Sequence, residues 1–400
     1  MFLEIIFDNA DFRKSIAEIL NGFEEVPQNI DEFYLRINSI FEDTRNSGNA
    51  IHPEGESQFK KFNEYMEIQR EYVLAAGDST MEYNRQAFWP NPEKGGRYGG
   101  SIYNTLPVLK NEGLLTKETP FGSGGGCFNT MITDRIIARG YNYIGKELDY
   151  DVNTRIGVTN ADPKNPRYQA SCLWGIMLLS SSYAYIAELA YGEREIPNIL
   201  LPVTKSPPRF ADPFRCGVIF PSTEAYIEEY PRHIQNTRDV FSECKVFLAF
   251  IGVNEGWGFL KDGTMLPRHP GYSSTHGVLK FHTLSIEDNI RYLKRFVDLV
   301  TAHNRDIQII LGISPVPIIK TGLGLKQHVI NANTLGKAIM RLAVEEVVNS
   351  YDHVHYLASL EAGTTCVRDS YASNDRYASD EAQEKIMEVF EAQFLTGAEV

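Results

Sequence analysis

A serine and an asparagine stand where buried strands are predicted to end, and their side chains could carry out acyl-transfer chemistry. Ser79 follows the short apolar run Tyr72–Ala76, and Asn254 follows a longer run that ends at Ile251. A serine at a strand-to-helix turn can attack a carbonyl carbon, because the helix N-terminus behind it helps to hold the developing oxyanion. A side-chain amide at a neighbouring strand end can donate to that oxyanion. We therefore expect Ser79 as nucleophile and Asn254 as oxyanion donor.

Both residues also have a purely structural interpretation. Ser79 begins the segment Ser-Thr-Met-Glu, and the spacing alone favours a helix N-cap over a nucleophile. Asn254 could be a turn residue that satisfies backbone groups of its own loop. A serine hydrolase also needs a base, and the nine histidines of the chain offer no obvious one. His233 and His328 are the candidates for lining a pocket, with a structural role as the alternative for each.

The elements that would position these residues follow from the apolar pattern. Continuous apolar runs predict strands buried on both faces at residues 72–76, 245–251, 307–313 and 353–357. Apolar residues at helical spacing predict helices at about 127–139, 171–190, 224–242, 285–303, 332–349 and 379–394. This alternation predicts the α/β class: a three-layer α/β/α sandwich with a mainly parallel sheet of about five strands in flavodoxin-like order. Ligands of such sheets bind at the carboxyl ends of the strands.

A glycine-rich segment, residues 122–126, precedes one of these helices but lacks the pattern of a cofactor site. Cys127 stands where a dinucleotide-binding motif needs its third glycine, and the preceding residues 116–120 do not read as a strand. A phosphate-binding Gly-Lys-Ser/Thr sequence is also missing. We expect no cofactor and no metal ion. Gly125 and Gly126 are predicted to form a turn through which a ligand reaches the helix N-terminus.

Composition restricts the class of protein and its surroundings. The chain has 400 residues, of which 43% are hydrophobic, and a net charge of −13, so a folded core is expected and a nucleic-acid partner is not. No apolar run has the length of a membrane span, and acidic residues stand where a signal peptide would carry Lys or Arg. The five cysteines form no Cys-x-x-Cys pair, which predicts buried, reduced structural thiols in a cytoplasmic protein.

Residues 1–70 differ in pattern from the rest of the chain. Phe12, Ile16 and Ile19 recur at helical spacing, and a polar stretch at residues 46–49 then interrupts the pattern. We expect a helical accessory segment over residues 1–70 and a single α/β domain over residues 71–400. Packing against the main domain and binding of a protein partner are the two roles considered for this segment.

Several motifs in order resemble the GSCFA family, a branch of the SGNH-hydrolase (GDSL-type) superfamily. The resemblance covers roughly residues 85–394. It is carried by residues 125–129, 140–143, 212–215, 233–234, 252–257, 262–263, 270–271, 314–317 and 328–329. It implies the SGNH-hydrolase fold and an acyl-ester hydrolase or O-acyltransferase activity, with a small-molecule or glycan acyl ester as substrate.

The chain departs from the family pattern at its catalytic positions. The family's nucleophilic serine falls on Gly126, and its Asp-x-x-His falls on Asn374 and Tyr377. The threonine of the strand-end motif is Asn254. Glycine carries no nucleophile, and a tyrosine, with a pKa of about 10, is a poor base at neutral pH.

Two functions remain open from the sequence. In the first, ester chemistry is re-sited or impaired, with Ser79, Asn254 and Tyr377 as the catalytic residues and the amides of Gly125 and Gly126 as further oxyanion donors. In the second, the chain is a pseudo-enzyme that binds a ligand or a protein partner without cleaving it. In either case the residues expected to contact the ligand are Gly125, Gly126, Gly252, Trp257, His233, His328 and Asn374.

Overall fold

The computed structural model describes residues 89–94, 100–147, 170–205, 208–215, 218–268 and 277–398. The chain divides into two compact units, residues 1–102 and residues 103–400. Ser79 and the predicted helical segment of residues 1–70 lie outside the described residues. The fold described below is that of the second unit.

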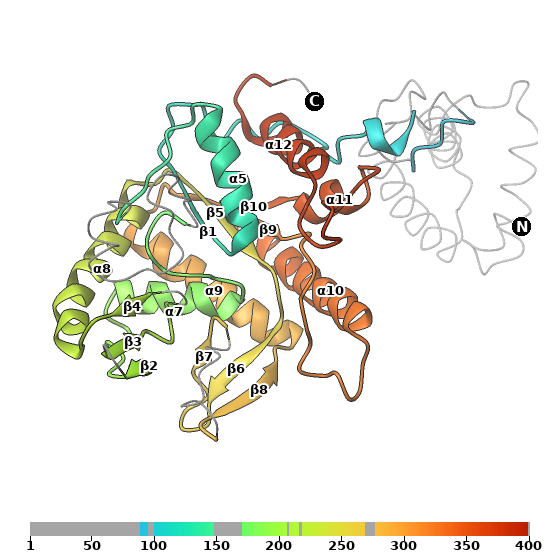
Figure 1. The fold of residues 1–400 in the computed structure, drawn as a ribbon. Helices are drawn as coiled ribbons and strands as arrows, with labels where there is room; N and C mark the ends of the chain where they lie inside the picture. Colours follow the sequence, from blue (N-terminus) through green and yellow to red (C-terminus); the bar gives the residue numbers. More distant parts are fainter. Residues whose placement is uncertain are drawn as a thin grey trace, which may run out of the picture. The chain divides into compact units, whose positions relative to one another are not determined.

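A parallel sheet forms the centre of this unit (Figure 1). Among the described residues it has four strands, in the order β1 (Phe121–Gly124), β5 (Val246–Ile251), β9 (Gln308–Ile313) and β10 (Val354–Leu357). Three of them are apolar runs that the sequence predicts as strands. The remaining predicted run, residues 72–76, lies outside the described residues.

The strand β1 was not expected, because glycines rather than large apolar side chains form much of it. The sequence predicts a turn here with no preceding strand, yet Phe121–Gly124 pairs in parallel with β5. A Cβ atom on Gly122 would lie 2.5 Å from Sγ of Cys244, and one on Gly124 would lie 3.1 Å from Cε1 of Tyr183. Core side chains therefore pack directly on the strand backbone, which removes the apolar signal by which buried strands are recognised.

Among the described residues, a β-bridge lies beside β1 on the side away from β5. Tyr143 forms a parallel bridge with Phe121. The Phe121 amide donates to the Asn142 carbonyl at 3.0 Å, and the Ile144 amide donates to the Phe121 carbonyl at 2.7 Å. This segment follows β1 in the chain and pairs on the side away from β5, which is the place of the second strand in a flavodoxin-like sheet. The described sheet thus has four strands, against an expectation of about five, and one bridge beside β1.

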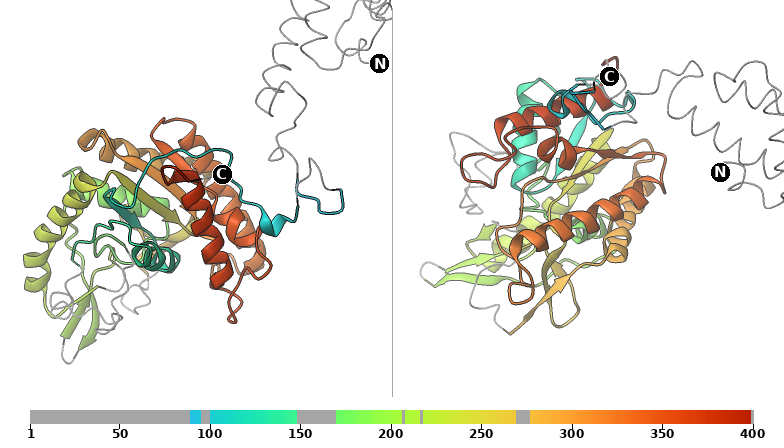
Figure 2. Two further views of the ribbon diagram at one scale, coloured as in Figure 1. Left: turned by 90° about the horizontal axis from the view of Figure 1, so that it is seen from above. Right: turned by 90° about the vertical axis from the view of Figure 1, so that its right-hand side faces the viewer.

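Helices cover both faces of the sheet and give the three-layer arrangement (Figure 2). One face carries α5 (Cys127–Ala138), α11 (Ser359–Thr364) and α12 (Asp380–Phe394). The other carries α7 (Ser180–Ala190), α8 (Thr223–Glu243), α9 (Ile286–His303) and α10 (Val329–Val348). Side chains of β5 alternate between the two cores, with Leu248 and Phe250 facing α5 and Phe247 and Ile251 facing the other layer.

Shorter elements surround the sandwich. One antiparallel sheet consists of β2 (Leu201–Lys205), β3 (Pro208–Ala211) and β4 (Ile219–Phe220), and another of β6 (Glu255–Phe259), β7 (Met265–Leu266) and β8 (Leu279–Thr283). A 3₁₀ turn, η3, spans Ile102–Asn104. The predicted helix of residues 171–190 is shorter than expected, since α7 begins only at Ser180. Among the described residues no helix has both the length and the apolarity needed to cross a bilayer.

Candidate functional site

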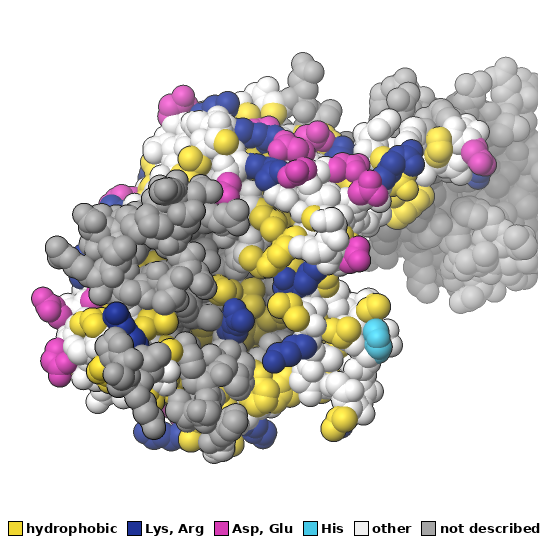
Figure 3. Space-filling model, viewed as in Figure 1, with side chains coloured by type: hydrophobic (Ala, Val, Ile, Leu, Met, Phe, Trp, Pro, Cys, Tyr) yellow, Lys and Arg dark blue, Asp and Glu magenta, His cyan; other side chains and the backbone are white. Residues whose placement is uncertain are grey.

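A cavity of about 700 Å³ lies where three strands of the sheet end. Gly126 follows β1, Gly252 follows β5 and Ser314 follows β9, and all three line the cavity. The face of the molecule in Figure 3 shows a hollow in which hydrophobic side chains gather, with Lys or Arg side chains beside them. The cavity is therefore at the carboxyl edge of the sheet, the position at which parallel α/β sheets bind ligands.

Most of the cavity wall is apolar. Trp257 of β6 and Phe281 of β8 pack edge to face, with ring centroids 5.6 Å apart, and both line the cavity. The other hydrophobic lining residues are Phe128, Ile176, Leu178, Phe250, Val253, Pro267, Val316, Pro317, Ile318 and Ile319. Such a wall suits an acyl chain, because burying each CH₂ group stabilises the bound state by about 0.8 kcal/mol.

Gly126 forms the N-cap of α5 and has little room for a side chain. A Cβ atom at this position would lie 2.5 Å from Cδ2 of Leu178 and 3.5 Å from Cγ2 of Ile176. The backbone carbonyl of Leu178 accepts hydrogen bonds from the amides of Gly252 at 2.9 Å and Val253 at 3.1 Å. The Leu178 side chain thus occupies the space that a serine at position 126 would need, and its carbonyl engages two amides at the end of β5.

Tyr377 also lines the cavity, together with its neighbour Arg376. Asn374 is exposed and positions both, because its Oδ1 accepts from the amides of Arg376 at 3.0 Å and Tyr377 at 2.9 Å. The Arg376 guanidinium donates to the Pro317 carbonyl at 3.2 Å and lies 4.9 Å from the centre of the Tyr377 ring. Gly126, Gly252, Trp257 and Tyr377, four of the residues singled out from the sequence, therefore meet at one cavity.

The side chain of Lys337 in α10 hydrogen-bonds to the backbone just after β5 and β9, beside this cavity. Its buried Nζ donates to the carbonyls of Gly252 at 2.7 Å, Ser314 at 2.6 Å and Val316 at 3.0 Å. Three acceptors match the three N–H bonds of an ammonium group. Burial lowers the pKa of Lys337 to about 7, so its proton is held less tightly than in water. From the sequence alone no role is expected for Lys337, because a single lysine in a helical segment usually faces solvent.

Asn254 lies behind the cavity wall and is not among the described residues that line it. Its Nδ2 donates to the Leu284 carbonyl at 3.3 Å, and its own carbonyl accepts from the Leu284 amide at 2.7 Å. Its Oδ1 faces α10, where a Cβ atom on Gly336 would lie 2.5 Å away. These are the contacts of a residue that joins backbone segments, and a role as oxyanion donor stays a prediction.

The two histidine candidates and Gly125 have structural contacts. His328 is exposed and caps α10, with Nδ1 accepting from the Ile330 amide at 3.3 Å. Gly125 is buried, and its carbonyl accepts from the Met177 amide at 3.0 Å. His233 is buried in a separate polar cluster. None of these three is among the described residues that line the cavity, while Ser79 lies outside the described part of the chain.

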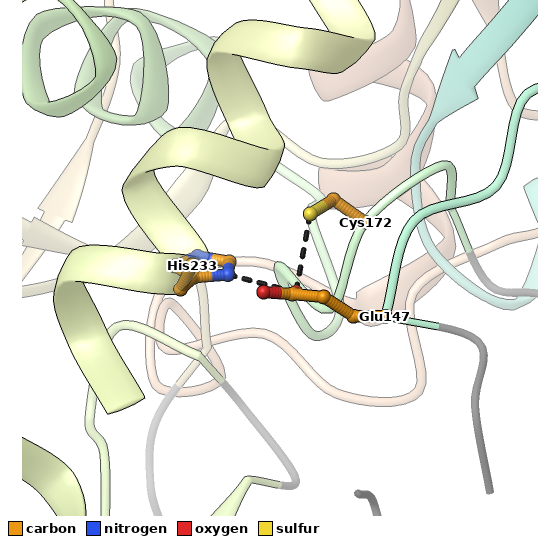
Figure 4. Close-up of side chains that lie close together, drawn as sticks. All are labelled: Glu147, Cys172 and His233. Carbon is orange, nitrogen blue, oxygen red and sulfur yellow. Dashed lines mark hydrogen bonds and ion pairs between the residues drawn. The ribbon is translucent and has the colours of Figure 1, made fainter. Parts of the chain in front are cut away.

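The cluster around His233 is centred on a buried carboxylate (Figure 4). Oε2 of Glu147 accepts from Nδ1 of His233 at 2.9 Å, from Sγ of Cys172 at 3.1 Å and from the Leu173 amide at 3.0 Å. Arg215 lies 4.0 Å from the same oxygen. Burial alone would raise the pKa of Glu147, but the His233 and Arg215 charges hold it well below its usual range.

Glu147, Cys172 and His233 are also residue types that bind metals, and their ligand atoms lie within 4.8 Å of one another. The surroundings fit a metal poorly. Burial raises the pKa of the Cys172 thiol well above its usual value, which opposes the thiolate that a metal needs. Arg215 adds a fixed positive charge beside the same carboxylate. We interpret the cluster as a structural network. It could not be predicted from the sequence, because its members lie far apart in the chain.

The thiols differ in exposure more than expected. Cys172, Cys244 and Cys366 are buried, in agreement with the sequence prediction, and Cys216 lies outside the described residues. Cys127 is only partly buried and lines the cavity as the first residue of α5. The expectation that all five cysteines are buried is therefore wrong for Cys127, because the end of α5 opens onto the cavity.

The fold and cavity define the class of protein: a three-layer α/β protein with a cavity at the carboxyl edge of a parallel sheet. A model of the GSCFA family matches residues 121–390, more than half of the chain. The chain therefore belongs to the GSCFA family. Searches of curated proteins and of solved structures found no match.

Proposed function

We propose that the cavity binds the acyl part of an ester and that the chain descends from SGNH-type ester hydrolases or O-acyltransferases. The observation that carries this proposal is the position of Gly126. It falls where the family resemblance expects the nucleophilic serine, and it lines a largely apolar cavity at the strand ends. Membership of the GSCFA family supports a hydrolase-like origin.

The same residues favour binding over serine-based cleavage. Gly126 offers no hydroxyl group, and Leu178 fills the adjacent space. Tyr377 lines the cavity where the resemblance expects the histidine base, and a phenol is a poor substitute for an imidazole as a general base. The chain is accordingly a pseudo-enzyme at this position: it holds an acyl ester without the groups that would cleave it by the family's mechanism.

A second candidate function is ester turnover with a different nucleophile. The partly exposed thiol of Cys127 lines the same cavity, one residue from Gly126, and favours this candidate. A thiol can attack an ester carbonyl to form a thioester, with cleavage of the ester C–O bond and release of the alcohol, which takes up the thiol proton. Water then hydrolyses the thioester to the free acid and regenerates the thiol. Ser79, the nucleophile predicted from the strand pattern, is the alternative attacking group.

Binding is tested by saturation-transfer NMR with ethyl hexanoate as the ester. We expect transfer to the acyl chain in the wild type and its loss in Leu178→Trp, because an indole at position 178 fills the cavity. Leu325→Trp is the matched control, since Leu325 is fully exposed and is not among the lining residues. Absent transfer in the wild type, or equal transfer in Leu178→Trp, contradicts the proposal.

Turnover is tested separately with p-nitrophenyl butyrate and a fluorophosphonate probe. The pseudo-enzyme proposal predicts no hydrolysis above the rate of a heat-denatured sample and no labelled serine. Hydrolysis that disappears in Cys127→Ala selects the thiol, and hydrolysis with labelling that disappears in Ser79→Ala selects the serine. Either result replaces the pseudo-enzyme proposal with the second candidate.

A further inference from the structure

The cavity differs in charge from the chain as a whole. Of the residues that the structure describes, three cationic side chains line it, Arg268, Lys320 and Arg376, against one carboxylate, Glu255. The complete chain has a net charge of −13. Cations are therefore gathered at the cavity in a protein that is otherwise acidic, and a positively charged wall favours a ligand of negative charge.

None of the three cations has an ion pair among the described residues. Arg268 and Lys320 are exposed, which leaves their charged ends able to reach a ligand at the cavity mouth. Arg376 donates to the Pro317 carbonyl, a neutral acceptor, so within the described part of the chain no carboxylate offsets its charge. Their positive charge is thus available to a bound anion.

The carboxylate of Glu255 is hydrogen-bonded to another residue of the cavity lining, Thr321. Oε2 of Glu255 accepts a hydrogen bond from Oγ1 of Thr321 at 2.8 Å. Burial raises the pKa of Glu255, although this hydrogen bond opposes the rise. Glu255 therefore offsets the cations only in part.

The N-terminus of α5 adds to the positive potential. Gly126, Cys127 and Phe128 all line the cavity, so the first turn of this helix faces it. No side chain caps the helix, because its N-cap residue is Gly126. Amide groups of a first helical turn favour a nearby anion.

We propose that the ester bound in this cavity carries an oxyanion, such as a carboxylate, which Arg268, Lys320 and Arg376 bind while the acyl chain lies against Trp257 and Phe281. This inference rests on the proposed function and names the chemical class of its ligand. A carboxylate pairs well with arginine, because guanidinium presents its N–H groups in the geometry of the two oxygens.

Two esters of similar length separate the contributions of charge and acyl chain. Monoethyl suberate carries one ester and one carboxylate, whereas diethyl suberate carries two esters and no charge. By isothermal titration calorimetry at pH 7.5, we expect the wild type to bind the monoester about tenfold more tightly. Added salt should weaken binding of the monoester alone, since only that interaction is screened.

The double variant Arg268→Gln/Lys320→Gln removes two cations that have no described structural contact. We expect it to bind the monoester about tenfold more weakly than the wild type and the diester equally well. The matched control is Lys110→Gln/Lys245→Gln, which removes the same charge at exposed residues outside the lining. It should bind both esters as the wild type does.

The outcomes distinguish this inference from the function on which it rests. Equal affinity of the wild type for the two esters overturns the inference and leaves the acyl-ester proposal standing. An equal loss of monoester binding in the control variant also overturns it, because net charge alone would then explain the effect. Failure of both esters to bind overturns the inference and the proposed function together.

Discussion

The side chain of Leu178 stands against Gly126, so that a Cβ atom on the glycine would lie only 2.5 Å from the leucine Cδ2. These two residues meet at the N-terminus of α5, on the wall of the cavity. The family resemblance expects a serine at position 126. In this chain the glycine at position 126 and the leucine at position 178 pack against each other. A side chain added at position 126 should therefore change the free energy of unfolding, and the change should depend on Leu178.

Replacing Gly126 by serine should have opposite effects on stability in the wild type and in a Leu178→Ala background. In the wild type, Gly126→Ser should lower the free energy of unfolding by about 1 kcal/mol, because Leu178 must move. In a Leu178→Ala background the space is free, and the serine can cap α5, so the same change should stabilise by about 0.5 kcal/mol. Urea denaturation of the four proteins in this cycle measures both effects. Equal effects in the two backgrounds would show that Leu178 does not oppose a serine.

The stability effect of a substitution at Gly336 should likewise change sign when Asn254 is shortened. Gly336 lies inside α10, where alanine is normally preferred by about 1 kcal/mol. Here a Cβ atom would lie 2.5 Å from Oδ1 of the buried Asn254. We therefore expect Gly336→Ala to lower the free energy of unfolding by about 1–2 kcal/mol in the wild type. In an Asn254→Ala background it should instead stabilise by about 1 kcal/mol.

Thermal and urea unfolding of the Asn254/Gly336 cycle provide the test. Strictly additive effects would mean that the two residues do not interact. Position 254 is where the family resemblance expects a threonine, and the asparagine found there packs against the glycine at position 336.

The sheet could be predicted from sequence where large apolar residues mark it. The runs that became β5 and β9 are rich in Val, Ile, Leu and Phe, and such runs indicate strands buried on both faces. The run that became β10, Val-His-Tyr-Leu, is shorter and more polar but keeps apolar residues at both ends. The pattern does not predict β1, because Gly122 and Gly124 carry no side chains. The atoms that cover these two glycines belong to Cys244 and Tyr183, which lie elsewhere in the sequence. Sequence periodicity records only the side chains that a strand itself carries.

The site could be predicted in part. Strand-end reasoning and motif resemblance named Gly126, Gly252, Trp257 and Tyr377, which meet at the cavity. The cationic lining and the buried lysine were not identified, because such residues in a single sequence look like ordinary surface charges. The cluster of Glu147, Cys172 and His233 depends on long-range folding that spacing does not reveal.

The buried amine of Lys337 should give the protein a distinctive pH dependence. Burial lowers its pKa to about 7 from a model-compound value of 10.5. Below pH 7 the folded and unfolded chains both hold the proton. From pH 7 to 8.5 the unfolded chain keeps it while the folded chain loses it, so stability rises with pH by at most about 1.4 kcal/mol per unit.

Comparison with Lys337→Met isolates this effect, because every other titrating group is common to both proteins. The difference in unfolding free energy, wild type minus variant, should rise from pH 7 to 8.5 and stay constant between pH 5.5 and 6.5. A difference that stays flat up to pH 8.5 would show that the three carbonyl acceptors keep the ammonium protonated.

The location of the bound ester is tested most directly by the reactivity of Cys127, the partly exposed thiol in the cavity wall. Peptide mass spectrometry would follow its alkylation by iodoacetamide with and without monoethyl suberate, with the buried Cys172 and Cys244 as internal references. At ten times the dissociation constant, the account predicts that alkylation of Cys127 slows about tenfold. An unchanged rate at Cys127 under saturating ester would place the ligand elsewhere and contradict the account.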